Sequence, residues 1–417
     1  MGSSLLRNAV YIMLTTGVNS ALGYAFWLVV ARSYDAEQVG VASALIAAMT
    51  VVAAVADLGT STALIQRLPS RRTDAEWSRT LTASVITATV AGVGIALAAA
   101  TTGVPSLSDD LGVLDSDAAH VALFAAGVAI WSLSVVSDYL FVAERRSEHM
   151  FTRNLAFGVA KLALVVVLVV AGDETAVGVF AAWIAGCALS LAVAYALLLP
   201  RLARRYRPAL DGVRAELRAM RGMYAGNYFI TLGYLLTTFV LPLLVVARLS
   251  AEHTAYFWVT WLMGGAFFTV TSSVGSALFA EGTNEPTELA RQTRSAVRIS
   301  AVLLAPLMVV FLVGAEPILG LFGDEYADEG TTLLVLLTAS AIPDAITGLY
   351  LARVRAEGRL VFPAAASMAM AAVTLVGAWF LLPSMELAGP GVAFIAAHVA
   401  GSLACGVDWR LNRRSRR

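Results

Sequence analysis

The stretches NAVYIMLTTGVNSALGYAFWLVVA (8–31) and VGVASALIAAMTVVAAVADLGTSTAL (39–64) decide the class of fold. Each apolar run is long enough to cross a bilayer, because a helix needs about 20 residues to span a hydrocarbon layer roughly 30 Å thick. Lipid offers no water to open backbone groups, so these runs must be helical. The first run is longer than a signal-peptide core and leads into further runs, so we expect an uncleaved helix.

Similar runs recur along the 417 residues, of which 59% are hydrophobic and 14% charged. This composition is too apolar for an ordinary soluble domain. The sequence predicts an all-α polytopic protein of the cell membrane with about twelve transmembrane helices. The predicted spans are 8–31, 39–64, 81–103, 119–143, 154–171, 176–199, 223–248, 254–280, 299–320, 330–352, 361–383 and 390–409.

Arginine placement predicts the orientation of these spans. With the amino terminus in the cytoplasm, 26 of the 29 basic residues fall on the cytoplasmic side, all but Arg32, Lys161 and Arg248. The outer segments SLSDDLGVLDSD (106–117) and GDEYADE (323–329) contain acids and no bases. Because positively charged loops stay inside, we expect both termini to be cytoplasmic.

An internal repeat predicts two lobes, 1–199 and 223–417, with six helices each. A shift of 216 residues places VVAR (29–32) on VVAR (245–248) within one continuous register. Since each half has an even number of spans, the copies share one orientation, as in parallel-repeat transporters that work by alternating access.

The segment 200–222 joins the two lobes, and its sequence PRLARRYRPALDGVRAELRAMR (200–221) is strongly basic. Apolar residues recur at helical spacing among its arginines, namely Leu210, Val213, Leu217 and Met220. The pattern predicts a cytoplasmic amphipathic helix lying on anionic headgroups. The alternative is a basic surface for a protein partner.

Motifs of catalysis are absent from the sequence, so we expect no enzyme, no cofactor and no metal site. Lys161, the only lysine, lies in FGVAKLA (157–163), which is not a phosphate-binding loop, so no ATP is used. The four histidines have no metal-ligand spacing, and Cys187 and Cys405 lie in apolar runs as inert core residues. The 29 acids balance the 29 bases, and no feature indicates nucleic acid.

Four ionisable residues within the spans are the candidate cavity residues: Lys161, Asp57, Asp344 and Asp138. Each lies about 10 to 15 Å along a helix from the nearest cytoplasmic arginine, where a charge is costly unless paired or hydrated. The functional hypothesis is that Lys161 meets an anionic head group, while Asp57 or Asp344 binds a driving proton or cation. The alternative is a static Asp57–Lys161 pair, or snorkelling of Lys161 and Asp138 to the interface.

Arg32 and Arg248 occupy equivalent positions in the repeat, at the outer ends of the first and seventh spans. We expect them to anchor these ends at the interface. Because the pair recurs in both halves, they are also candidates for lining the outer mouth of a substrate cavity.

Residues 8–69 resemble the amino-terminal spans of the polysaccharide-transport (Wzx-type) flippases, in the multidrug/oligosaccharidyl-lipid/polysaccharide (MOP) exporter superfamily. The matching elements are AR (31–32), a short acidic loop ending in Gly40, and DLGTSTAL (57–64). The resemblance implies twelve to fourteen helices in two lobes around a central cavity. It also implies translocation of an isoprenoid-diphosphate-linked oligosaccharide to the outer leaflet, driven by an ion gradient. Implied partners are this lipid-linked glycan, membrane lipids and the machinery that polymerises and exports the glycan.

The main rival hypothesis is an ion-coupled exporter of small molecules or drugs. A major facilitator would place a GxxxDRxGRR-like turn between spans two and three, whereas this chain has QRLPSRRTD (66–74). A multidrug exporter of the same superfamily would share the fold and differ in the chemistry of its cavity.

Overall fold

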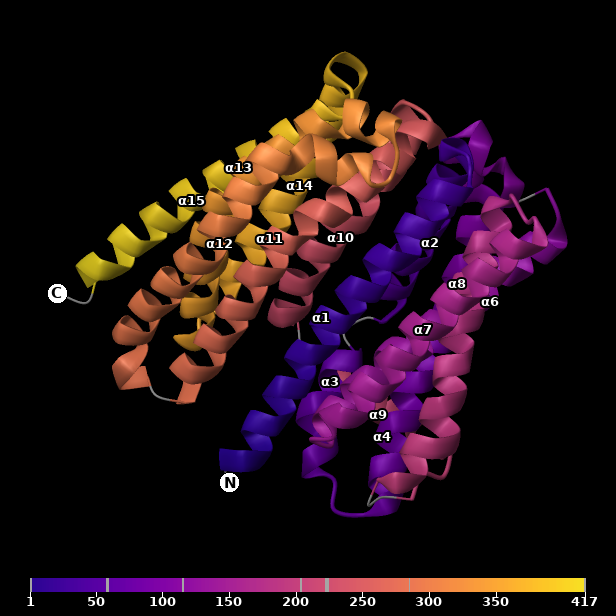
Figure 1. Ribbon diagram of the computed structural model, residues 1–417. Helices are drawn as coiled ribbons and strands as arrows, with labels where there is room; N and C mark the ends of the chain where they lie inside the picture. The colour runs from indigo at the N-terminus through magenta and orange to yellow at the C-terminus, as the bar shows by residue number, and fades with distance from the viewer. Residues whose placement is uncertain are drawn as a thin grey trace. The chain divides into compact units, whose positions relative to one another are not determined.

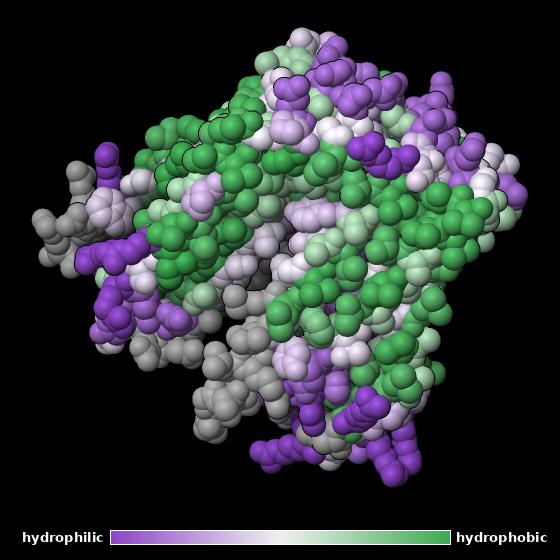
Figure 2. All heavy atoms as spheres, viewed as in Figure 1, coloured by the Kyte–Doolittle hydropathy of each residue, from purple (hydrophilic) through white to green (hydrophobic). Residues whose placement is uncertain are grey.

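The computed structural model describes residues 2–57, 60–114, 116–202, 205–221, 225–284 and 286–415. Nearly all of them are helical, and none of them lies in a strand. Among these residues, 12 helices are long and apolar enough to cross a membrane. Figure 2 shows apolar residues along the middle of the helices of each unit and hydrophilic ones gathered at the helix ends. The prediction of an all-α protein with twelve membrane spans is confirmed.

The chain packs as two compact units, Met1–Tyr228 and Phe229–Arg417. The first unit contains six of the spans (Figure 1). Its α-helices are α1 (Gly2–Ser33), α2 (Ala36–Asp57), α3 (Thr60–Arg67), α4 (Asp74–Ile86), α5 (Gly92–Ala98), α6 (Ala118–Ala143), α7 (Ser147–Ala171), α8 (Ala176–Val193) and α9 (Val213–Arg221). Short 3₁₀ or π-helical segments connect or extend them. They are η1 (Leu68–Ser70), η2 (Thr87–Ala91), η3 (Ala99–Gly103), η4 (Pro105–Leu107), η5 (Asp109–Leu114), η6 (Ala194–Leu198) and η7 (Leu199–Arg201).

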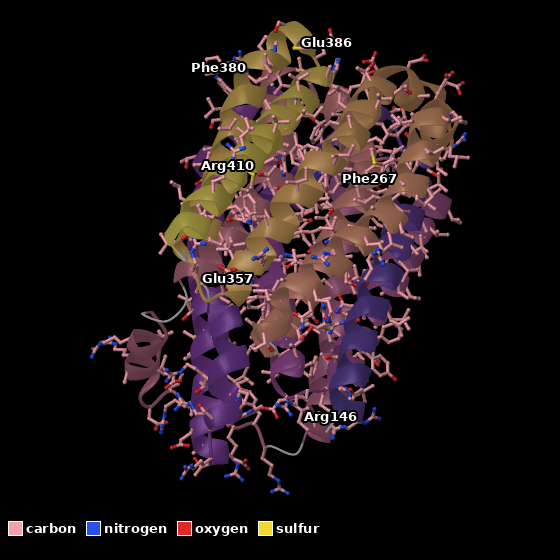
Figure 3. The ribbon with its side chains drawn as sticks, turned by 90° about the vertical axis from the view of Figure 1, so that its left-hand side faces the viewer. Arg146, Phe267, Glu357, Phe380, Glu386 and Arg410 are labelled. Atoms are coloured by element: carbon pink, nitrogen blue, oxygen red, sulfur yellow. The ribbon has the colours of Figure 1, made fainter. Side chains whose placement is uncertain are left out.

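The second unit contains the other six spans. Its helices are α10 (Ala225–Arg248), α11 (Ala251–Asn284), α12 (Leu289–Gly320), α13 (Asp324–Ala356), α14 (Val361–Met385) and α15 (Ala388–Ser415), with the short turn η8 (Pro286–Glu288) before α12. Glu357 and Glu386, on either side of α14, lie at opposite ends of this unit (Figure 3).

The two units share one pattern of helix packing. In the first, α2 packs on α6, α6 on α8 and α7 on α8. The equivalent spans of the second unit do the same, since α11 packs on α13, α13 on α15 and α14 on α15. Helices at equivalent places in the two units therefore pack in the same pairs.

Several helices extend beyond the apolar runs that predicted them. The ninth span was expected at 299–320, yet α12 begins at Leu289 and carries Arg291, Arg294 and Arg298 in its first turns. A helix satisfies its own backbone groups and therefore continues from lipid into water, whereas an apolarity pattern detects only the part within lipid.

The second span was expected at 39–64. The structure describes it as α2, up to Asp57, and α3, from Thr60, and residues 58–59 lie outside the described part of the chain. One carboxylate oxygen of Asp57 accepts hydrogen bonds from the backbone N–H of Ser61, at 3.1 Å, and from its hydroxyl, at 2.5 Å. The Asp57 carboxylate is thus already bound by polar groups of its own chain segment.

The basic stretch after the sixth span is held against the first unit by a buried acid. Glu216 of α9 accepts hydrogen bonds from Arg67 Nε at 2.9 Å, from Thr80 Oγ1 at 2.8 Å and from Arg71. Leu217 packs on the hydrophobic cluster around Trp77, while Leu210 is exposed. The expected position of this helix on lipid headgroups stays a prediction, and the side chain of Met220 lies outside the described residues.

Candidate functional site in each unit

Lys161 lies in a cluster of aromatic rings inside the first unit. Its Nζ is 3.7 Å from the ring centroid of Trp183, 4.7 Å from that of Phe157 and 5.1 Å from that of Phe26. The side chain is 4% exposed. Aromatic faces attract a cation, which partly replaces its lost hydration.

Close packing of α7 on α8 creates this arrangement. A Cβ at Gly186 would lie 2.8 Å from the backbone nitrogen of Lys161, so only a glycine allows this approach. Trp183 precedes Gly186 by one helical turn and therefore lies on the same side of α8. The sequence thus brings the indole against the ammonium group.

Neither polar donor of this cluster has an acceptor among the described residues. No acidic side chain lies within ion-pair distance of Lys161 there, so the alternative of a static Asp57–Lys161 pair is not what the structure shows. The buried Nε1 of Trp183 also has no hydrogen-bond partner in that part of the chain. Buried donors without acceptors are costly, and an anion would satisfy them.

The carboxylate of Asp138, by contrast, already has hydrogen-bond partners within the first unit. Its carboxylate receives two hydrogen bonds from Arg153, at 2.8 and 2.6 Å, and one from the Asn154 amide at 3.0 Å. Arginine placement predicts Arg153 to be cytoplasmic, yet its side chain is 2% exposed inside the first unit. A bidentate pair of this kind neutralises the acid. The Asp138 side chain, which is 26% exposed, is therefore already paired within this unit.

The second unit contains a polar cavity of about 380 Å³ among α10, α11, α13, α14 and α15. Asp344, His398 and Arg355 line it together with Tyr234 and several threonines and serines. The guanidinium of Arg355 also lies 4.5 Å from the ring centroid of Phe279. Charged groups are rare within membrane spans, so a cavity that collects three of them is a candidate site.

Asp344 and His398 face each other in this cavity. The Oδ1 of Asp344 is 3.4 Å from Nε2 of His398, while Nδ1 of the same ring donates to the carbonyl oxygen of Phe394 at 3.0 Å. With Nδ1 carrying the hydrogen, Nε2 accepts or shares a proton with the carboxyl. The buried Oδ2 of Asp344 has no hydrogen-bond partner within the described ranges.

Arg32 and Arg248 are exposed at the ends of α1 and α10. The guanidinium of Arg248 lies 4.5 Å from the ring centroid of Trp379, on α14. An arginine stacked on an exposed indole is typical of an interfacial anchor. Neither residue lines the polar cavity of the second unit.

Four residues of these sites were not predicted from the sequence: His398, Arg153, Arg355 and Trp183. His398 had a usable signal, because it is ionisable and lies within the apolar run 390–409. Arg153 had none, since it stands at the edge of its apolar run, where arginines normally remain in water. Trp183 looked like any core aromatic. No group of three or more metal-ligating side chains occurs in the part of the chain that the structure describes.

One known sequence family matches most of the chain. The sequence model of the polysaccharide biosynthesis protein family matches residues 29–329, which confirms the family likeness predicted from residues 8–69. No curated protein matches the chain significantly.

Solved structures of similar fold are transporters. An inward-facing multidrug resistance MATE family transporter of the MOP superfamily has a TM-score of 0.74 and 14% identity, covering 95% of this chain and 96% of that one. Lipid II flippase MurJ, in an inward closed conformation, has a TM-score of 0.77 and 11% identity, covering 96% and 87%. A MOP superfamily transporter from Pyrococcus furiosus, described as having a binding pocket of reverse polarity that suggests a different function, has a TM-score of 0.64 and 14% identity, covering 98% and 95%. At such identities the likeness establishes the fold.

Proposed function

The chain belongs to the polysaccharide biosynthesis protein family, and on this premise we propose that it is a flippase for a lipid-linked glycan. The substrate is an isoprenoid-diphosphate-linked oligosaccharide, carried from the cytoplasmic to the outer leaflet of the cell membrane. The lobes alternate in access, and the polar head crosses while the tail stays in lipid. Proteins that polymerise and export the glycan remain the expected partners.

The observation that carries this proposal is the acceptor-free ammonium of Lys161. It is buried within a membrane span, its surroundings are aromatic, and no carboxylate among the described residues neutralises it. A diphosphate supplies oxygen acceptors and negative charge, which both the ammonium and the Trp183 indole lack. Aromatic faces also suit the apolar faces of sugars and prenyl groups.

The same geometry disfavours an exporter of cationic drugs. Such a substrate needs an uncompensated acid, but Asp138 of this unit is already bound by Arg153 and Asn154. In the second unit, Asp344 faces His398 and shares its cavity with Arg355. Cavity polarity also separates functions within this fold in the description of the Pyrococcus furiosus transporter. Here the polarity favours an anion.

We assign the driving ion to a proton bound between Asp344 and His398. The two groups are placed to share one proton, and the cavity around them contains polar side chains that can form hydrogen bonds with the protonated pair. Asp57 is the weaker candidate, because its carboxylate already accepts the hydrogen bonds of the Ser61 backbone N–H and hydroxyl.

Deletion of the gene followed by mass spectrometry of lipid extracts tests the proposed substrate. We expect lipid-linked oligosaccharide to accumulate and surface glycan to fall. An unchanged glycolipid pool with altered sensitivity to cationic dyes would support the drug exporter instead.

Reconstitution in proteoliposomes tests the role of Lys161. A labelled polyprenyl-diphosphate sugar is placed in one leaflet, and its appearance in the other is followed for wild type, Lys161→Met and Lys161→Arg at matched protein content. We expect Lys161→Met to lose at least tenfold in rate and Lys161→Arg to retain part of it, because the positive charge is kept. Equal rates in all three would reduce Lys161 to a structural residue.

A pH gradient imposed on the same vesicles tests the proton site. We expect wild type to respond to the gradient, while Asp344→Asn and His398→Gln transport at a rate that no longer depends on it. A gradient response that persists in both variants contradicts the assignment, even if the glycolipid is the substrate.

A further inference from the structure

The second unit also carries an apolar groove, separate from the polar cavity, that the proposed transport does not use. It has a volume of about 580 Å³ and is lined by α12, α13 and α15. Both α12 and α15 pack along α13, and the described residues give little contact between α12 and α15 themselves. The face of α13 that carries Ile342, Ile346 and Leu349 therefore forms the floor of a trough between two walls.

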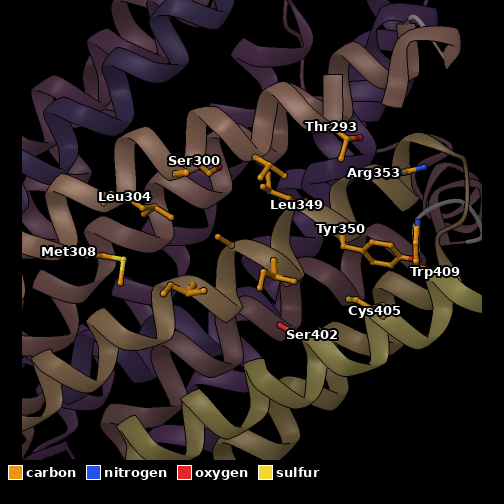
Figure 4. Close-up of a pocket in the computed structure, with 17 residues that line it drawn as sticks. Thr293, Ser300, Leu304, Met308, Leu349, Tyr350, Arg353, Ser402, Cys405 and Trp409 are labelled. Carbon is orange, nitrogen blue, oxygen red and sulfur yellow. The ribbon is translucent and has the colours of Figure 1, made fainter. Parts of the chain in front are cut away.

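The two ends of this groove differ in chemistry (Figure 4). Arg353, Tyr350 and Trp409 lie together at one end, whereas Leu304 and Met308 lie toward the other. A second, more polar hollow of about 180 Å³ adjoins the first end and is lined by Arg353, Glu357 and Trp409 among others. The groove thus has the polarity of an amphiphile, with one charged end and an apolar remainder.

Arg353 has hydrogen-bond donors at that end that no described residue uses. Its Nε is 3.4 Å from the carboxylate of Glu357, and its two terminal nitrogens have no hydrogen-bond partner among the described residues. Arg359, the other base of this hollow, is already bound by Asp408 at 2.6 Å. Arg294, Arg298 and Arg410 are exposed on the same ends of α12 and α15. The charged end therefore suits an anionic group.

The length of the groove matches one leaflet. From Ile342 to Arg353 the floor helix rises about 16 Å, at 1.5 Å per residue. Half of a hydrocarbon layer of roughly 30 Å is about the same distance. Trp409, which is 43% exposed, lies at the charged end of the groove, and indoles are enriched at membrane interfaces. A single acyl chain lying along α13 would place its headgroup beside Arg353.

From these observations we propose that the groove binds one chain of an anionic phospholipid from the leaflet at the Arg353 end, with its phosphate held by Arg353. That leaflet is the one that arginine placement predicts to be cytoplasmic, where anionic lipids are abundant. The bound chain fills the trough between α12 and α15 and holds both helices against α13. The site is a lipid site distinct from the transport cavity.

Gly406 is a suitable position at which to block the groove, since it lines the groove and a Cβ built there meets no atom within 4 Å. We expect Gly406→Leu to occupy part of the groove and to fold, because its Cβ meets no neighbouring atom and leucine raises helix propensity. Gly94→Leu is the matched control, because Gly94 is also exposed on a helix with no atom within 4 Å of its Cβ, but lies in α5 of the first unit.

Native mass spectrometry of the full-length protein with added phosphatidylglycerol or phosphatidylcholine measures binding. We expect wild type and Gly94→Leu to retain phosphatidylglycerol equally, and Gly406→Leu to lose at least fivefold in occupancy. Arg353→Gln should lose the preference for phosphatidylglycerol over phosphatidylcholine. Bound phosphatidylglycerol should also raise the Tm of wild type, but not that of Gly406→Leu.

Two outcomes would overturn the proposal. One is equal retention of phosphatidylglycerol by Gly406→Leu and Gly94→Leu. The other is displacement of phosphatidylglycerol from wild type by an equimolar polyprenyl diphosphate, which would assign the groove to the transport substrate.

Discussion

Arg153 of α7 binds Asp138 of α6 through two parallel hydrogen bonds, Nε to Oδ1 at 2.8 Å and Nη2 to Oδ2 at 2.6 Å. The remaining Nη1 donates to Ser134 of α6 at 2.5 Å and to Ser190 of α8 at 3.3 Å. One guanidinium therefore connects three helices inside the first unit. Within lipid, no water can replace any of these partners.

Removing either member of this pair should destabilise the first unit. Arg153→Met leaves the Asp138 charge uncompensated, and we expect a loss of about 3–5 kcal/mol, the usual cost of breaking a buried ion pair. The double variant Arg153→Met/Asp138→Leu should recover part of this loss, because no charge remains buried. Thermal unfolding in detergent measures wild type, Arg153→Met, Asp138→Leu and the double variant. Additive losses in the double variant would show that the two side chains are not coupled.

Gly186→Ala should separate α7 from α8 at the Lys161 cluster. The added Cβ would lie 2.8 Å from the backbone nitrogen and 2.9 Å from the Cα of Lys161, and backbone atoms cannot move aside as a flexible side chain can. We expect a loss of about 1–3 kcal/mol from overpacking. Gly94→Ala, where the space is open, is the control and should be neutral or stabilising. A Gly186→Ala protein as stable as the control would mean that the helices do not approach this closely.

Docking of α9 should depend on pH through Glu216. Burial by itself raises the pKa of Glu216, but hydrogen bonds from Arg67, Thr80 and Arg71 outweigh it and hold the pKa below the ordinary value of 4.5. A folded-state pKa below the unfolded one stabilises the docked state above about pH 4.5, and this stabilisation is lost as the pH falls through the lower, folded value.

Hydrogen exchange of residues 205–221 measures this docking. We expect slow exchange at pH 7 and faster intrinsic-rate-corrected exchange in acid, with Glu216→Gln behaving at pH 7 as wild type does in acid. Asp211→Asn is the control, since the Asp211–Arg79 pair is exposed and such pairs contribute little. Protection that survives in Glu216→Gln would assign docking to the apolar contacts of Leu217 instead.

Arg248 should behave as an anchor and not as a ligand. Its guanidinium stacks on Trp379, and it is exposed at the end of α10. Arg248→Gln should therefore change the transport rate less than twofold, against at least tenfold for Lys161→Met, and cost at most about 1 kcal/mol of stability. Both are measured on the same reconstituted preparations. A loss of transport as large as that of Lys161→Met would instead place Arg248 in the substrate path.

Apolar runs predicted the fold class well because the bilayer imposes one rule on every span. The helix that contains Lys161 was expected at 154–171 and is found as Ser147–Ala171. The start of α12 at Leu289 was not predicted, because a helix that continues from lipid into water carries no apolarity signal there.

Candidate site residues could be predicted from the sequence in part, but their side-chain partners could not. Lys161 was identified from its sequence alone, because a base in the middle of an apolar run is exceptional. Phe157 lies one helical turn away on the same helix, but Phe26 and Trp183 come from α1 and α8, and no spacing rule connects those two with Lys161. His398 and Asp344 are likewise brought together only by the packing of α15 on α13.

The amino-acid sequence was sufficient to predict the helical class, the number of spans and some of the ionisable residues within them, Lys161 and Asp344 among these. These follow from the cost of placing polar backbone and charge in hydrocarbon, which each residue incurs independently of its neighbours in space. The packed helices alone show that Arg153 neutralises Asp138, and that Lys161 has no carboxylate partner among the residues that the structure describes. Such pairing depends on distances of a few ångströms between different helices, and those distances are set by packing, as at Gly186, which the linear order of residues does not specify.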